Sequence, residues 1–119
     1  MTPHRYQSID PGVLMEAAGD HGTFVTLSHT FLEHAPGLLS RLQQAFARRD
    51  YPAIAAGSHA LKGMAMLIGA AELSSELQRH ESAARQGCAL DAAQAALPPL
   101  LALVMREVTQ SIVRLAPQQ

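Results

Sequence analysis

The spacing of the apolar residues is the feature that most constrains how this chain of 119 residues can fold. Apolar side chains recur three and four positions apart through long segments, and no stretch of useful length alternates as a β-strand does. The sequence therefore predicts an all-α protein, an antiparallel, up-down four-helix bundle with a short extra N-terminal helix. Residues 1–8 are expected to form a flexible lead-in, and residues 9–116 a single domain.

Aspartate, proline and glycine residues mark the expected helix ends. Asp10 followed by Pro11 predicts the start of the short helix, and Gly19 predicts its end. The longer helices are expected from about His21 to Arg49, from Asp50 to near Gly69, from Ala70 to Gln86, and after Leu90, with Asp91 as a possible cap or with the regular helix beginning only at Pro98-Pro99. Pro36 falls inside the first of these, where the apolar pattern keeps its phase. A kink is therefore expected there, with a break into two helices as the alternative.

The same periodicity gives each helix a side that faces the core. In the longest helix the expected core residues are Phe24, Leu27, Phe31, Ala35, Leu38, Leu42 and either Ala45 or Phe46. In the last two helices they are Leu73, Leu77, His80, Ala84, Leu97, Leu101, Val104, Val108, Ile112 and Leu115. These sets predict one continuous core built mainly from aliphatic side chains.

Charge and cysteine content exclude several classes of protein. The formal net charge is −1 and the basic residues are scattered, so no nucleic-acid surface is expected. One cysteine, Cys88, allows neither an internal disulfide nor a cysteine-rich zinc site, and no His-x-x-x-His pair is present. The N-terminus lacks an apolar signal region, and no apolar run is long enough to span a membrane. We therefore expect a soluble, cytoplasmic protein that binds no metal and no membrane.

The third expected helix carries a histidine on the side turned away from the core. Its apolar side comprises Ile54, Gly57, Leu61, Met64, Ala65 and Ile68. His59 lies in the middle of the opposite side, with Lys62 one helical turn later. Small residues at Ala55, Ala56 and Gly63 leave the imidazole unshielded. The pattern predicts an accessible histidine offered to a partner, the alternative being an exposed histidine without a role.

Such a histidine can carry a phosphoryl group. A neutral imidazole is a nucleophile near neutral pH, and its attack on phosphorus gives a phosphoramidate. The ammonium of Lys62 can screen phosphate oxygens, and Gly63 leaves room for the incoming donor. No other acid, base or metal cluster surrounds His59 in the sequence, which favours a passive carrier over a complete enzyme.

A short turn at Gly69 predicts that the third and fourth helices form an antiparallel hairpin. Residues at equal distances from this turn then face each other, which makes Gln78, Glu81 and Arg85 the best candidates to stand beside His59. Either Glu81 or Gln78 could hold the second ring nitrogen and thereby set the tautomer.

The segment His59-Ala60-Leu61-Lys62-Gly63, with Gly69-Ala70 after five further residues, resembles the signature of histidine phosphotransfer (HPt) domains. The family pattern continues with a leucine and a Cys-x-x-Leu-Glu-like end, where this chain has Leu73, Leu77 and Glu81. The opening helices are similar to those of the family at Ile9 to Leu14, Gly19-Asp20, Phe24 and Phe31 to Pro36. The resemblance covers about residues 9–115.

The resemblance implies a carrier that relays phosphoryl groups between aspartates of receiver domains, in response regulators and a hybrid sensor histidine kinase. His59 would be phosphorylated on Nε2, Lys62 would assist phosphate binding, and Gly63 would admit the active site of the receiver. Glu81 and Arg85 match positions near the histidine in some members. No autonomous catalytic turnover and no cofactor are expected, because Mg²⁺ is bound by the receiver partner only.

The receiver is expected to dock on the exposed faces of the first three long helices around His59, with an apolar seat at Ala55, Ala56 and Met66. The interface should be small and transient, since the partner must change. We expect a monomer, and the near-complete ends of the sequence suggest a free-standing protein, with a domain of a longer hybrid kinase as the alternative.

Three residues depart from the family pattern. Met64 stands where many members have serine, Leu77 replaces a frequent cysteine, and His80 replaces the leucine before the glutamate. Met64 and Leu77 should affect packing only, whereas His80 is either a hydrogen-bonded core residue or a residue at the bundle edge near the site. Two other functions remain as alternatives: a helical scaffold module that does no phosphotransfer, and a structural bundle with a metal or cofactor in its core.

Overall fold

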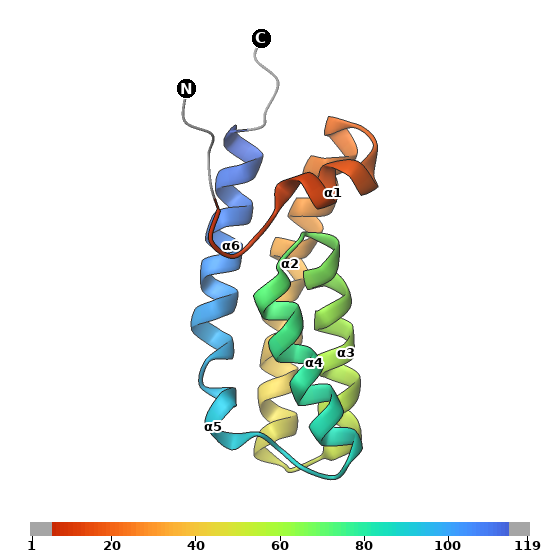
Figure 1. Ribbon diagram of the computed structural model, residues 1–119, viewed down its shortest axis with the longest axis vertical. Helices are drawn as coiled ribbons and strands as arrows, with labels where there is room; N and C mark the ends of the chain where they lie inside the picture. Colours follow the sequence, from red (N-terminus) through yellow and green to blue (C-terminus); the bar gives the residue numbers. More distant parts are fainter. Residues whose placement is uncertain (1–5, 115–119) are drawn as a thin grey trace.

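The computed structural model describes residues 6–114. Four long helices stand side by side and run alternately up and down: α2 (His21–Ala47), α3 (Tyr51–Leu67), α4 (Ala71–Arg85) and α6 (Leu97–Arg114) (Figure 1). The short helix α1 (Pro11–Ala18) lies at the end of the bundle where α3 turns into α4, and the single-turn helix α5 (Asp91–Gln94) lies at the other end. The predicted fold class is confirmed, with α5 as an additional turn of helix.

Aspartate side chains cap three of the helices, as the sequence predicts. The Asp10, Asp20 and Asp50 carboxylates accept hydrogen bonds from the backbone N–H groups of Gly12, Thr23 and Ala53. The bond from Thr23 lowers the pKa of Asp20 below its usual value. These caps satisfy backbone donors that have no partner inside the helix, so the starts of α1, α2 and α3 are encoded locally.

The longest helix, α2, is continuous through Pro36, so the alternative of two separate helices is wrong. It ends at Ala47, two residues before the expected end. Leu39 is buried where Leu38 was expected, and Leu38 is only partly buried. Leu38 and Leu39 both lie three or four positions from Ala35 and from Leu42, so the periodic pattern does not distinguish them.

The last helix begins at the later of its two expected starts. Asp91 does not cap the last helix; it is the first residue of α5 and forms an ion pair with Arg49, with 3.0 Å between Nη2 and Oδ2. The regular helix α6 begins at Leu97, and its first turn contains Pro98 and Pro99. Proline is tolerated there because the first N–H groups of a helix have no internal acceptor.

Helix α6 contributes the predicted stripe Leu97, Leu101, Val104 and Val108 to the core. The expected core residue Leu115 lies outside the described residues. The segment Asp91–Arg114 is long and apolar enough to cross a membrane by length and composition, although the sequence analysis expected no such run. Its apolar side is packed against the bundle, which is the pattern of a core helix in a soluble protein.

The N-terminal segment is attached to the bundle from residue 6 onward. Oε1 and Oε2 of the buried residue Glu107 on α6 accept hydrogen bonds from the backbone N–H groups of Ser8 and Gln7, at 2.6 and 2.9 Å. The Ser8 hydroxyl donates to the same carboxylate. Residues 6–8 of the expected flexible lead-in are thus held against α6, while residues 1–5 lie outside the described part.

The turn between α3 and α4 is closed by the same segment. The backbone N–H of Asp10 donates to the carbonyl oxygen of Gly69 at 3.0 Å. Gly69 has φ +73°, and a β-carbon at this position would collide with the Asp10 backbone. Only glycine fits here, because it adopts a positive φ without strain and leaves room for Asp10. The predicted short hairpin of α3 and α4 is therefore confirmed, with the N-terminal segment packed on its turn.

Candidate functional site

The side of α3 that faces away from the core presents His59 to solvent. The His59 side chain is 65% exposed, whereas Ile54, Leu61 and Ala65 of the opposite side are buried. The sequence-based assignment of the two helix faces is confirmed at these positions. The ring is thus reachable by another molecule.

Glu81 on α4 holds the inner nitrogen of this ring. His59 Nδ1 lies 3.2 Å from Oε2 and 3.3 Å from Oε1 of Glu81, whose side chain is only 5% exposed. The hydrogen bond from Lys62 lowers the pKa of Glu81, Arg85 adds to this effect, and burial opposes it. Because an ionised carboxylate only accepts hydrogen bonds, Nδ1 must carry the proton. The lone pair of the neutral ring is then on Nε2.

Two cations form ion pairs with the Glu81 carboxylate. Lys62 Nζ lies 2.8 Å from Oε1, and Arg85 Nη2 lies 2.6 Å from Oε2. Lys62 is mostly buried, with 16% of its side chain exposed, and also donates to Gln78 Oε1. Arg85 is 64% exposed. With His59 neutral, the ionised groups sum to one net positive charge.

The structure brings together all four residues that the sequence places beside His59, and it separates their roles. Glu81, rather than Gln78, contacts the imidazole. Gln78 instead contacts Lys62, and its amide nitrogen donates to Ser82 Oγ at 2.9 Å. The sequence left the choice between Glu81 and Gln78 open, and the depth of Glu81 in the α3–α4 interface decides it.

The two glycines in the interior of α3 serve opposite sides of the helix. A β-carbon on Gly57 would lie 3.3 Å from Leu42 Cδ1 on α2, so Gly57 permits close packing inside the bundle. A β-carbon on Gly63 would meet no atom of the described residues within 4 Å, and Gly63 is exposed. The surface at Gly63, beside His59, is therefore open to another molecule.

The residues expected to form an apolar docking seat are accessible to different degrees. Ala56 and Met66 are exposed, and Ala55 is partly buried. Met66 is 58% exposed, which is a large exposed area for an apolar side chain. These three residues lie on α3 together with His59.

His80 lies next to Glu81 in the sequence but belongs to the core. It is 1% exposed, and its ring centroid is 5.1 Å from that of Phe46 on α2. Among the described residues neither ring nitrogen has a hydrogen-bond partner, so the expected core position is confirmed without its hydrogen bond, and a position at the bundle edge near the site is wrong. Burial lowers the pKa of His80, while Glu76 opposes the shift. Met64 is partly buried and Leu77 fully buried, in line with packing roles.

Glu107 is a buried residue of α6 that the periodic pattern of apolar residues does not predict. Its partners Gln7 and Ser8 are about a hundred residues away, so no local pattern could reveal them. Within residues 6–114, no three histidine, cysteine, aspartate or glutamate side chains form a group that could hold a metal ion.

Comparison with known proteins identifies the family. A family model described as "Hpt domain" matches residues 26–116. No curated protein sequence matches the chain. The fold is similar to the crystal structure of histidine-containing phosphotransfer protein B (HptB) from Pseudomonas aeruginosa PAO1, with a TM-score of 0.83 and 23% identity over 92% of this chain and 98% of that chain. The chain therefore belongs to the Hpt domain family, the histidine phosphotransfer proteins of two-component phosphorelays.

Proposed function

We propose that His59 is the residue that carries the phosphoryl group, on its Nε2 atom. The observation that supports this most directly is the contact between Nδ1 and the Glu81 carboxylate, which leaves the Nε2 lone pair as the nucleophile. The ring is exposed, and the space beside it at Gly63 is open.

In the proposed transfer, Nε2 attacks the phosphorus of an aspartyl phosphate on a receiver domain. The N–P bond forms while the bond between phosphorus and the aspartate oxygen breaks, and the aspartate leaves as a carboxylate. Positive charge develops on the imidazole, and Glu81 stabilises it through Nδ1–H. The reverse reaction passes the phosphoryl group to the aspartate of another receiver.

The cations of the site balance the charge of the phosphoryl group. Lys62 and Arg85 together exceed the charge of Glu81 by one. Either cation can turn toward phosphate oxygens while the other stays on the carboxylate. Lys62 lies one helical turn from His59, and Arg85 is the more exposed of the two.

Hpt domains exchange phosphate with receiver domains and kinases. We propose that this chain works with receiver domains of response regulators and of a hybrid sensor histidine kinase, as a cytoplasmic monomer. It would bind no nucleic acid, and Ala55, Ala56 and Met66 would contact the receiver. It would act as a carrier without catalytic turnover and without a cofactor, since Mg²⁺ would be bound by the receiver.

The test is transfer of radiolabelled phosphate from a phosphorylated receiver domain to the purified chain. We expect an acid-labile, alkali-stable label on the chain that His59→Gln removes and His29→Gln, a change at another exposed histidine, leaves in place. Transfer to the His59→Gln variant at the unaltered rate would overturn the assignment. A scaffold module would bind the receiver without accepting label.

A further inference from the structure

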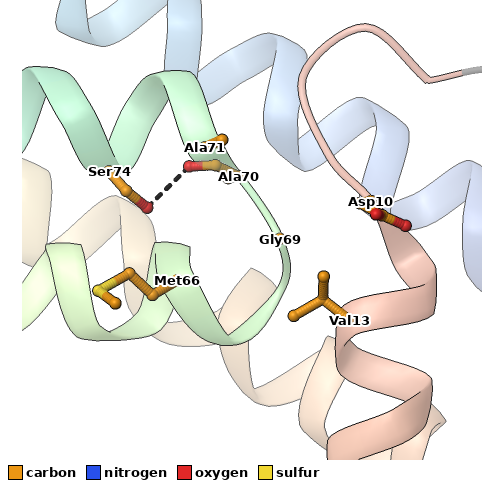
Figure 2. A pocket seen from close by; sticks show the side chains of 7 residues that line it. All are labelled: Asp10, Val13, Met66, Gly69, Ala70, Ala71 and Ser74. Carbon is orange, nitrogen blue, oxygen red and sulfur yellow. Dashed lines mark hydrogen bonds between the residues drawn. The ribbon is translucent and has the colours of Figure 1, made fainter.

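A hollow lies at the end of the bundle between α1 and the turn that joins α3 to α4. It has a volume of about 400 Å³, and the lining residues are Asp10, Val13, Met66, Gly69, Ala70, Ala71 and Ser74. Figure 2 shows Val13 on α1 and Met66 on α3 on either side of it, with Ala71 and Ser74 on α4 above. The wall is mostly apolar, and Asp10 is the only charged residue among the described residues that line it.

This hollow continues toward the candidate site. A second hollow, lined by Lys62, Met66, Ser74, Ser75, Gln78 and Arg79, shares Met66 and Ser74 with the first. Lys62 and Gln78 also belong to the cluster around Glu81. A partner positioned over His59 would therefore have a continuous path along the α3–α4 surface to α1.

Exposed apolar side chains gather at the same end of the molecule. Val13, Met66 and Leu67 are 42%, 58% and 39% exposed, and the remaining large exposed apolar residue in the described part, Val113, lies on α6. Grouped exposed apolar residues beside a polar site are typical of protein interfaces, and methionine adapts to more than one partner surface.

The N-terminal segment gives the hollow its shape. Asp10 and Val13 form one wall, and Asp10 is fixed to the turn by its bond to Gly69. Two residues earlier, Ser8 is bound to the buried Glu107 carboxylate on α6. Burial raises the pKa of Glu107, but the hydrogen bonds from Ser8 and Gln7 outweigh it and keep the pKa below its usual value. The Glu107 carboxylate is therefore ionised at neutral pH.

We propose that the hollow receives an apolar side chain of the receiver domain that exchanges phosphate with His59, and that Glu107 is a positioning residue that holds its α1 wall in place. The inference rests on the proposed function for the identity of the partner. It adds a contact surface on α1 and α4 to the apolar docking seat on α3. It also gives Glu107 on α6 an indirect effect on receiver binding.

Two aspartate substitutions form a matched test. Val13→Asp places a charge in the wall of the hollow, and Val113→Asp places the same charge at an exposed valine on α6. Affinity is measured by calorimetry with an unphosphorylated receiver domain, chosen as the fastest phosphate donor in a panel of receivers. We expect Val13→Asp to weaken binding by about tenfold or more, and Val113→Asp to leave it unchanged. Equal binding by Val13→Asp and the unaltered protein would overturn the proposal.

Methyl NMR locates the contact directly. On titration with the same receiver, we expect the Met66 and Val13 methyl signals to shift and those of Val113 to stay in place. Shifts confined to Ala55 and Ala56 would instead overturn the assignment of the hollow.

Glu107→Gln tests the positioning role. We expect it to weaken receiver binding and to move the Val13 signals, while the variant keeps its helical circular dichroism. Receiver binding equal to that of the unaltered protein, with the Val13 signals unmoved, would overturn the role of Glu107.

Labelling by phosphoramidate, whose leaving group is ammonia, separates this proposal from the proposed function. This small donor needs no docking surface, so we expect Val13→Asp to accept phosphate on His59 as the unaltered protein does. Loss of labelling in Val13→Asp alone would overturn a pure docking role for the hollow. Failure of the unaltered protein to accept phosphate would contradict the proposed role of His59. It would leave the calorimetric comparison of Val13→Asp and Val113→Asp unaffected.

Discussion

The ammonium of Lys62 lies 2.8 Å from Oε1 of Glu81, so this cation is bound to a carboxylate before any phosphoryl group arrives. The same carboxylate accepts from His59 Nδ1. Glu81 therefore links the nucleophile to the cation that follows it by one helical turn. A phosphoryl group on Nε2 would compete with Glu81 for Lys62.

Replacing Glu81 by glutamine should remove the negative charge that stabilises the His59 ring and the contact that fixes the tautomer of that ring. The neutral amide no longer stabilises positive charge on the ring and can bind either tautomer. Loss of a charged hydrogen bond of about 1.5 kcal/mol predicts phosphotransfer slowed about tenfold. The phosphotransfer rate is measured from reactions quenched at successive times, and the ¹⁵N chemical shifts of the His59 ring report the tautomer. Glu76→Gln, on the same helix and paired with Arg79, is the control. An unchanged rate and an unchanged tautomer would contradict the role of Glu81.

The two interior glycines of α3 should differ in how much alanine stabilises the protein. Gly63→Ala should raise the free energy of unfolding by about 0.5–1 kcal/mol, because alanine favours the helix and the added methyl meets no atom of residues 6–114. Gly57→Ala should raise the free energy of unfolding by less, because the added methyl would lie 3.3 Å from Leu42 Cδ1. Urea denaturation measures both values. Gly63→Ala should also slow transfer from a receiver domain, whereas labelling by phosphoramidate should be retained. A more stable Gly63→Ala variant with unaltered receiver transfer would show that the open space is not used by the partner.

His80 should make the stability of the bundle depend on pH. Burial lowers the pKa of His80 in the folded state, so the unfolded chain binds more protons below about pH 6.5 and stability falls as the pH decreases through that region. His80→Leu should remove this contribution. It should also raise the free energy of unfolding at pH 7 by about 1–3 kcal/mol, because no unpaired ring nitrogen remains buried. Urea titrations at pH 5 and pH 7.5 check both effects, with His29→Gln as the exposed control. An identical pH dependence in His80→Leu and the unaltered protein would contradict this account.

Much of the fold follows from signals that lie within one helical turn. Asp10, Asp20 and Asp50 each cap the helix that they precede, so the beginnings of α1, α2 and α3 could be predicted from adjacent residues. The placement of Gln78, Glu81 and Arg85 near His59 also followed from sequence, because a short turn fixes the register of a hairpin, but the choice of Glu81 as the contact of the ring did not. Leu39 could not be distinguished from Leu38 by periodicity alone.

Features that depend on distant contacts could not be predicted. Glu107 is buried because the N-terminal segment supplies hydrogen-bond donors from the other end of the chain. Asp91 looks like a helix cap in sequence, yet it pairs with Arg49 across the bundle end. Both residues depend on which chain segments meet in space, and local spacing carries no information about that.

The most direct test of the account is an NMR assignment of the phosphorylated site. The protein, labelled with ¹⁵N in its histidine rings, is phosphorylated by a receiver domain and examined through the coupling between phosphorus and ring nitrogen. We predict one phosphorylated ring, that of His59, with phosphorus on Nε2 and a proton on Nδ1 bound to Glu81. Phosphorus on Nδ1 of His59, or on another histidine, would contradict the account.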